Sequence, residues 1–180
     1  PKALGVDEAV QLADHHDEED DPWLDARDAA MVELLYGGCL RVGALIGLDV
    51  APSDAPLRAR RGWIYLLGAE VQVRGKGDKR RTVPVGRGAL QALQQWLAVR
   101  DKVPAQPQAA QALFIGRRGT RLTAQSVWQR LKRRSLRAGL ASIRSLSFGD
   151  FNVGFGNKAP YIGSDAIYLA VYAENGRRIS

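Results

Sequence analysis

Residues 71–85 read VQVRGKGDKRRTVPV, a pattern typical of two short strands joined by a tight turn. Valine and threonine favour an extended backbone, and the glycines on either side of Lys76 can supply the positive φ angles that turns use. Pro84 fits an edge strand, because proline cannot donate a hydrogen bond to a neighbouring strand. We therefore expect a hairpin over residues 70–85 whose tip presents Lys76 to the solvent.

The flanking sequence predicts a small sheet with helices around it. Residues 63–67, WIYLL, favour a further strand, and residues 1–13 favour a short helix or a linker. Apolar residues at helical spacing predict helices at residues 25–36, 40–48, 87–101 and 124–139. We expect an acidic loop at residues 14–25, where Pro22 opposes regular structure, and a strand-like run at residues 112–122. The predicted fold class is α+β, mainly α-helical with a small three-stranded antiparallel sheet.

Charge is distributed unevenly along the 180 residues, although the formal net charge is only +7. Residues 1–57 contain 3 bases and 13 acids, a balance of −10. Residues 58–144 contain 20 bases and 3 acids, a balance of +17, and the remainder is neutral. A field of this strength attracts polyanions, and the phosphate backbone of nucleic acid is the commonest of them. The alternative is a basic surface that is merely solvated.

Composition limits the cellular setting and the chemistry. The sequence has no apolar run long enough for a membrane helix and no signal-peptide pattern at its start. Its one cysteine, Cys39, fits a reducing compartment, so we expect a cytoplasmic protein that does not bind membranes. His15 and His16 lie in the acidic loop without the spacing of a zinc site, and no metal is expected.

Two basic residues suggest phosphate chemistry. Lys76 could approach a backbone phosphate closely and act as a general acid, or it could simply keep an exposed turn soluble. The sequence Gly-Lys-Gly is not a nucleotide-binding P-loop, because the Ser or Thr that follows the lysine there is missing. Arg41 lies in the otherwise apolar stretch YGGCLRVGALIGL, where an arginine either pairs with an acid or points into a site.

The helix expected at residues 124–139 combines a basic face with an apolar one. Its basic face would consist of Arg130, Arg133, Arg134 and Arg137. Its buried side would consist of Val127, Trp128, Leu131 and Leu136. Such a helix suits a DNA groove or a row of phosphates, and the near absence of acids around these arginines in the sequence argues against a solvated face.

Four blocks, in order along the chain, resemble the catalytic domain of the tyrosine recombinase (phage integrase-type) family, most closely the bacterial XerC type. The blocks are PKALGVDEAVQL (1–12), ARDAAMVELLYGGCLRVGALIGLD (26–49), VRGKGDKRRTVPVGRGALQALQQWL (73–97) and ALFIGRRGTRLTAQSVWQRLKRRSLRAGL (112–140). The resemblance implies that residues 1–140 are the catalytic-type domain, without the N-terminal core-binding domain of the family. Residues 141–180 would be a divergent tail.

The resemblance also implies a reaction. Arg41 matches the first active-site arginine, which binds the scissile phosphate, and Lys76 matches the hairpin lysine, which protonates the leaving 5′-oxygen. A tyrosine attacks the phosphate and forms a 3′-phosphotyrosyl link, so no metal or other cofactor is required. The implied partners are a double-stranded DNA recombination site and a second recombinase protomer, as in chromosome dimer resolution before cell division. The residues expected to bind DNA are Arg74, Lys79, Arg80, Arg81, Arg117, Arg118, Arg121, Arg130, Lys132, Arg133 and Arg134.

The sequence departs from the family pattern in several places, and one of them is the connection from Val50 to Arg74, which is longer than the family's usual one. The family carries an acidic residue three positions after the first arginine, where this chain has Ala44. The His-x-x-Arg box and the tyrosine in its family context are not recognisable after Leu140, so the nucleophile is unknown. We therefore expect a truncated and catalytically impaired form of a DNA-binding site-specific tyrosine recombinase. The alternatives are an active strand-transferase that recruits Tyr161, Tyr168 or Tyr172, and a non-catalytic basic module that binds DNA or a protein partner.

Overall fold

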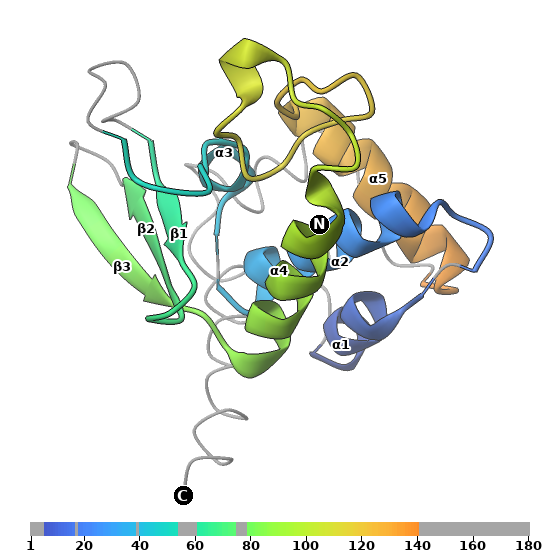
Figure 1. Cartoon of the computed structure of the whole chain (residues 1–180). Coiled ribbons are helices and arrows are strands. Elements are labelled where there is room, and N and C mark those ends of the chain that lie inside the picture. The colour runs from blue at the N-terminus through green and yellow to red at the C-terminus, as the bar shows by residue number, and fades with distance from the viewer. Residues whose placement is uncertain (1–5, 17, 39, 54–60, 75–78, 141–180) are drawn as a thin grey trace, which may run out of the picture.

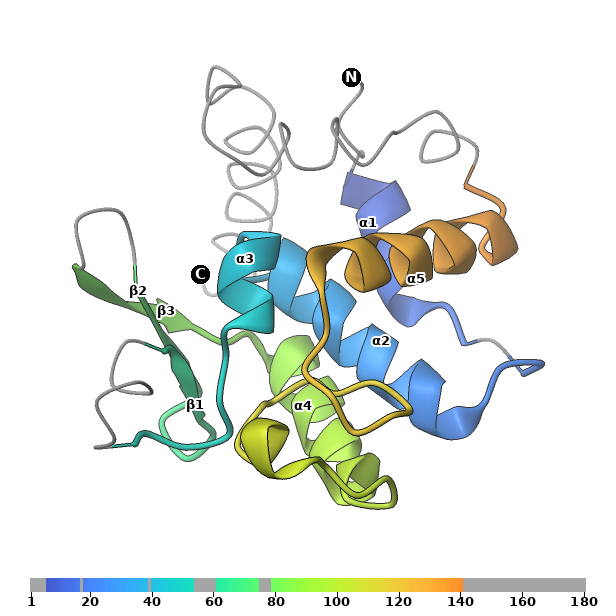
Figure 2. The same cartoon turned by 90° about the horizontal axis from the view of Figure 1, so that it is seen from above.

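The computed structural model describes residues 6–16, 18–38, 40–53, 61–74 and 79–140. Its elements are α1 (Val6–Asp14), α2 (Pro22–Tyr36), α3 (Val42–Ile46), β1 (Trp63–Tyr65), β2 (Glu70–Arg74), β3 (Arg80–Pro84), α4 (Arg87–Arg100), the 3-10 helix η2 (Pro107–Ala109) and α5 (Ala124–Arg137). The sheet lies on one side of the molecule and the longer helices lie on the other (Figure 1). Seen from above, α3 lies between the sheet and α5 (Figure 2).

The strands form one antiparallel sheet in the order β1-β2-β3. β2 pairs with β3 in the register Val71↔Val83 and with β1 in the register Ile64↔Val71. Ile64, Val71 and Val73 are buried, while the residues between them along the strands are more exposed, as expected for a sheet with one face on the core. β1 is shorter than predicted, because residues 66–69 form the turn to β2. The predicted fold class, mainly helical with a three-stranded antiparallel sheet, is confirmed.

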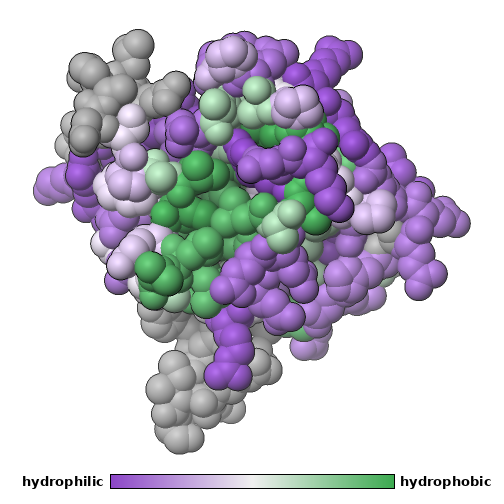
Figure 3. Space-filling model, in the orientation of Figure 1, coloured by the Kyte–Doolittle hydropathy of each residue, from purple (hydrophilic) through white to green (hydrophobic). Residues whose placement is uncertain are grey.

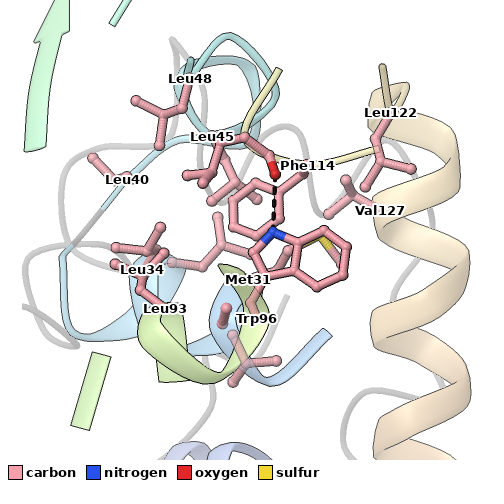
Figure 4. Close-up of a cluster of buried hydrophobic side chains, with 14 of the residues drawn as sticks. Met31, Leu34, Leu40, Leu45, Leu48, Leu93, Trp96, Phe114, Leu122 and Val127 are labelled. Carbon is pink, nitrogen blue, oxygen red and sulfur yellow. Dashed lines mark hydrogen bonds between the residues drawn. The ribbon is translucent and has the colours of Figure 1, made fainter. Parts of the chain in front are cut away.

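The core is centred on α2 and on Trp96 of α4. Trp96 is fully buried, and its Nε1–H donates a hydrogen bond of 2.9 Å to the carbonyl of Leu113 (Figure 4). Its ring meets Trp23 edge-on, with 5.0 Å between centroids, and stacks on Phe114 at 6.2 Å. This cluster joins α2, α4 and the segment before α5 into one hydrophobic core.

The acidic loop predicted at residues 14–25 is shorter than expected, because helices take up both of its ends. α1 includes Asp14, and α2 begins at Pro22. Proline is tolerated in the first turn of a helix, because the N–H it lacks would have no partner inside the helix. The Asp21 side chain accepts a hydrogen bond of 2.9 Å from the N–H of Trp23 and so caps the helix. The predicted bounds of the loop were wrong at its C-terminal end, because acids that repel one another in a loop are favourable at a helix N-terminus.

Residues 112–122, predicted as a strand-like run, form isolated bridges instead of a strand. Ala112 bridges Asp49, and Ile115 bridges Arg121 across a turn. The hydrogen bond from the Leu113 N–H to the carbonyl of Leu48, 2.9 Å long, holds this segment against the end of α3. The apolar run is therefore buried as a connection between elements and has no continuous strand partner.

α5 begins as predicted. The Thr123 hydroxyl accepts a hydrogen bond of 3.2 Å from the N–H of Ser126. The Ser126 hydroxyl in turn accepts one of 3.0 Å from the N–H of Thr123. This reciprocal arrangement satisfies two donors that would otherwise lack a partner. Leu136 was predicted to be buried and is 37% exposed, because the core contacts of the helix are made by residues nearer its start.

We expect Gly119→Ala to destabilise the fold by about 3 kcal/mol, through left-handed strain and overpacking together. Gly119 has a φ of +71°, and a Cβ there would lie 2.3 Å from the carbonyl oxygen of Pro104. Gly139→Ala is the matched control: its φ is +76°, but a Cβ would meet nothing within 4 Å. The control should therefore lose only about 1 kcal/mol. Urea unfolding measures both, and equal losses would contradict the close approach to Pro104.

Apolar side chains also reach the surface on the face seen in Figure 1, where Figure 3 shows a group of them. Leu67, in the turn between β1 and β2, is 94% exposed, and Tyr65 is 51% exposed. Elsewhere in the described part of the chain, Val10 and Leu136 are the other exposed large hydrophobic residues. None of the helices that the structure describes is both long and apolar enough to cross a membrane.

Candidate nucleic-acid interface

Arg41 directly precedes α3, and its side chain is exposed. Its carbonyl accepts a hydrogen bond of 2.9 Å from the N–H of Leu45, which is the first main-chain bond of the helix. The backbone of Arg41 is therefore held by α3. Among the residues that the structure describes, no ion pair involves its guanidinium. The role of Arg41 as a site residue stays a prediction from the sequence.

The β2–β3 hairpin carries most of the remaining candidates. Lys76 itself lies outside the described residues, together with the rest of residues 75–78. The predicted DNA-binding residues that flank it are Arg74, Lys79, Arg80 and Arg81. The guanidinium of Arg80 lies over the ring of Trp63 on β1, 5.3 Å from its centroid. This cation–π contact orients Arg80 on the outer face of the sheet while leaving its side chain exposed.

The turn before α5 presents two further arginines. Arg117 and Arg118 are both exposed. Arg117 forms an ion pair with Asp21 and lies over the ring of Trp23, 5.1 Å from its centroid. For Arg118, no ion pair is found within the ranges that the structure describes. Of the two, Arg118 can therefore meet a phosphate without giving up a contact.

The arginines of α5 mostly face the acidic N-terminal part of the chain. Arg134 is 5% exposed, bonds main-chain carbonyls of α1 and donates to Asp25 at 2.7 Å. Arg130 donates from Nε to Asp28 at 2.5 Å and pairs with Asp20 through its terminal nitrogen. Burial opposes the charge of Arg130, but these carboxylates outweigh it and raise its pKa above the ordinary value for arginine.

The basic face predicted for α5 is therefore largely neutralised inside the molecule. Arg137 at the end of the helix also pairs, with Glu19 at 3.2 Å. Of the two remaining bases of the helix, Arg133 is exposed, with its terminal nitrogen 4.0 Å from Asp20. Lys132 is half-buried, and its ammonium lies 4.9 Å from the Trp128 ring centroid. The absence of acids near α5 in the sequence was misleading, because the acids come from a segment more than 100 residues earlier.

Arg121 is also tied down inside the molecule. It donates hydrogen bonds of 2.9 Å to the carbonyls of Ile46 and Leu48 and forms an ion pair with Asp49. Together with Arg130 and Arg134, it has committed its guanidinium to intramolecular partners. The structure gives these three arginines internal contacts, and their predicted contact with DNA stays a prediction.

Two tyrosines lie in the described part of the chain, and neither suits a nucleophile. Tyr36 is 5% exposed, and burial, together with the charge of Glu8, raises the pKa of its hydroxyl. Tyr65 pairs with Glu70 at the end of the sheet opposite the β2–β3 hairpin. The tyrosines considered from the sequence, Tyr161, Tyr168 and Tyr172, lie outside the described residues.

Sequence reasoning missed the acidic partners of these arginines. Asp49 is 2% exposed and holds Arg121, and Asp28 is 1% exposed and holds Arg130. Two signals were available. A single acid in the apolar run LIGLDV needs a buried partner. Segments with balances of −10 and +17 are also expected to attract each other within one molecule.

Comparisons with known proteins identify relatives of this sequence. The profile of the phage integrase family matches residues 2–155. Tyrosine recombinase XerC 1 of Ralstonia nicotianae is 45% identical over 143 residues, which cover 78% of this chain and 43% of that protein. Tyrosine recombinase XerC of Pseudomonas aeruginosa is 39% identical over 137 residues, which cover 76% of this chain and 40% of that protein. The chain therefore spans about two fifths of the length of these curated relatives.

Solved structures share the fold. The crystal structure of XerA recombinase matches with a TM-score of 0.64 and 21% identity, covering 97% of this chain and 65% of that one. The post-cleavage complex of XerH recombinase with palindromic difH substrate matches with a TM-score of 0.64 and 18% identity, covering 98% and 43%. Because the family profile matches most of this chain, the chain belongs to the phage integrase family.

Proposed function

We propose that this chain is the DNA-binding portion of a site-specific tyrosine recombinase, and that Arg41 and Lys76 contact the phosphate at which a strand is cut. The observation that supports this most directly is Arg41, an exposed arginine held by α3 that has no acidic partner among the described residues. An exposed guanidinium without an acidic partner is available to form a bidentate pair with a phosphate of DNA.

The surroundings of Arg41 support the same proposal. Seen from above, α3 lies between the hairpin end of the sheet and the first turn of α5 (Figure 2). The exposed bases at the hairpin end of the sheet are Lys79, Arg80 and Arg81, and Arg118 is exposed in the turn that precedes α5. An extended set of bases next to one arginine suits the spaced charges of a duplex backbone better than a single small anion.

In the proposed reaction, Arg41 stabilises negative charge on the phosphoryl oxygens as the tyrosine oxygen attacks phosphorus. The bond from phosphorus to the 5′-oxygen breaks, and Lys76 donates a proton to that oxygen. No residue of the described part is assigned as nucleophile. Residues 141–180 contain no recognisable His-x-x-Arg box, and this favours a chain that binds DNA and is impaired in cleavage. A second recombinase protomer and a cytoplasmic location follow from the same proposal.

A nicked recombination-site duplex tests the proposal directly. The protein is incubated with it, and the mixture is run on a native gel and on a denaturing gel. Retardation on the native gel without a detergent-stable band means DNA binding without covalent chemistry, as proposed. A detergent-stable band means that a tyrosine of this chain attacks DNA, and peptide mapping names it. No retardation at low salt contradicts the DNA-binding proposal and favours a protein partner.

We expect Arg41→Ala and Lys76→Ala each to weaken binding to such a duplex by about tenfold, since each removes one charge-assisted hydrogen bond to a phosphate. Fluorescence anisotropy at fixed low salt measures the dissociation constants. Asp101→Asn is a suitable control, because Asp101 is an exposed acid at the end of α4. Two variants that bind like the parent would show that these residues are wrongly placed at the phosphate.

A further inference from the structure

We infer that Arg121 is a positioning residue for Arg41: it fixes α3, and through α3 the guanidinium that meets the phosphate. This inference rests on the proposed function. Sequence reasoning placed Arg121 among the residues that contact DNA directly. Its contacts instead point to an indirect role, because its hydrogen bonds and its ion pair converge on residues 46–49, immediately after α3.

α3 needs support from outside the helix. It consists of five residues, and an isolated helix of that length is unstable in water. The carbonyls at a helix C-terminus have no partner inside the helix and carry partial negative charge. Arg121 supplies both a donor and a positive charge at this place, through bonds of 2.9 Å to the carbonyls of Ile46 and Leu48.

Asp49 links this support to the rest of the fold. Its carboxylate is buried and pairs with Arg121. Its N–H donates to the carbonyl of Gly62 at 2.8 Å, and its carbonyl accepts from the N–H of Ile64 at 3.2 Å. The segment that follows α3 is therefore bonded to β1, in the same sheet whose hairpin carries Lys76. Arg121 thus joins three parts: α3, the sheet and the turn that leads to α5.

The consequence for the site is geometric. Arg41 directly precedes the first turn of α3, and Arg121 bonds the last turn, roughly 7 Å further along the helix axis at about 1.5 Å per residue. A rigid short helix transmits the position of one end to the other. Loss of Arg121 should therefore let Arg41 move relative to the hairpin, even though Arg121 is not expected to touch the phosphate.

A double-mutant cycle on DNA affinity tests this role. We expect Arg121→Ala to weaken binding about fivefold in the parent, but less than about twofold in an Arg41→Ala background, because the residue to be positioned is then absent. Arg118→Ala is the matched control, since Arg118 lies on the same turn, is exposed and is proposed to meet DNA itself. The losses of DNA affinity caused by Arg118→Ala and by Arg41→Ala should multiply in the double variant.

A second variant separates positioning from folding. Arg121→Ala leaves the buried Asp49 carboxylate without its partner, which can unfold the protein. Arg121→Met combined with Asp49→Asn removes both charges and keeps the volume. This variant should unfold within a few degrees of the parent and still show the weakened binding that depends on Arg41.

The outcomes separate this inference from the proposed function. A parent chain that retards no DNA contradicts the proposed function itself. If the parent binds but the losses from Arg41→Ala and Arg121→Ala multiply, Arg121 contacts DNA directly and the positioning role is wrong. Unchanged affinity in a folded Arg121→Met, Asp49→Asn variant would equally refute it, because the pair would then serve stability alone. An Arg41→Ala variant of normal affinity removes the residue to be positioned and overturns the inference.

Discussion

Asp28→Asn is expected to lower the free energy of unfolding by about 3–5 kcal/mol, because it breaks a buried ionic network by removing one charge. The Asp28 carboxylate is 2% exposed and accepts from Arg27 at 2.8 and 2.9 Å and from Arg130 at 2.5 Å. Asparagine has nearly the same volume, so the loss would come from the charge and not from a cavity. The buried Arg27 guanidinium and the half-buried Arg130 guanidinium would then face a neutral amide.

The size of this effect comes from burial and not from the number of ion pairs. Asp101→Asn is the matched control, since Asp101 also pairs with an arginine, Arg100, but its side chain is 84% exposed. An exposed pair contributes about 0–1 kcal/mol. Urea unfolding of both variants, with the slope checked for constancy, measures the difference. Similar losses in the two variants would show that Asp28 is not the buried link between α2 and α5.

We expect DNA affinity to fall by about 2000-fold between about 50 mM and about 200 mM salt, if about six bases each displace one counterion. The six bases assigned to phosphates are Arg41, Lys76, Lys79, Arg80, Arg81 and Arg118. The arginines paired inside the molecule do not enter this count, because their counterions are carboxylates of the same chain. A prediction from net charge alone would give a steeper dependence.

Arg80→Ala combined with Arg81→Ala should reduce the same loss to about 150-fold, since two fewer counterions are released. Arg87→Ala is the control, because it also removes the positive charge of an exposed arginine. Arg87 is exposed at the start of α4, which follows the end of β3 farthest from the hairpin (Figure 1). Its removal should leave the salt dependence unchanged. A reduced slope for Arg87→Ala, or a normal slope for the double variant, would place the DNA elsewhere.

Local patterns predicted the elements well. The hairpin around Lys76, the α4 helix and the α5 helix with its Thr123 cap were all expected from residues close together in the sequence. Their boundaries depend on alternation, helical spacing and capping, which are local properties of the chain. The failures were of another kind. Residues 112–122 and Pro22 were misjudged because burial and helix-end electrostatics decided them.

The sequence by itself determined which elements form and that the chain carries a strongly basic segment, because periodicity and charge can be counted along the chain. It also identified Arg41 and Lys76 as the pair to test. Only the tertiary structure decided which bases remain available. Arg121, Arg130 and Arg134 pair with Asp49, Asp28 and Asp25, and each partner is more than 70 residues away. Ion pairing falls off over a few ångströms, so it depends on distances in space that the order of residues does not contain.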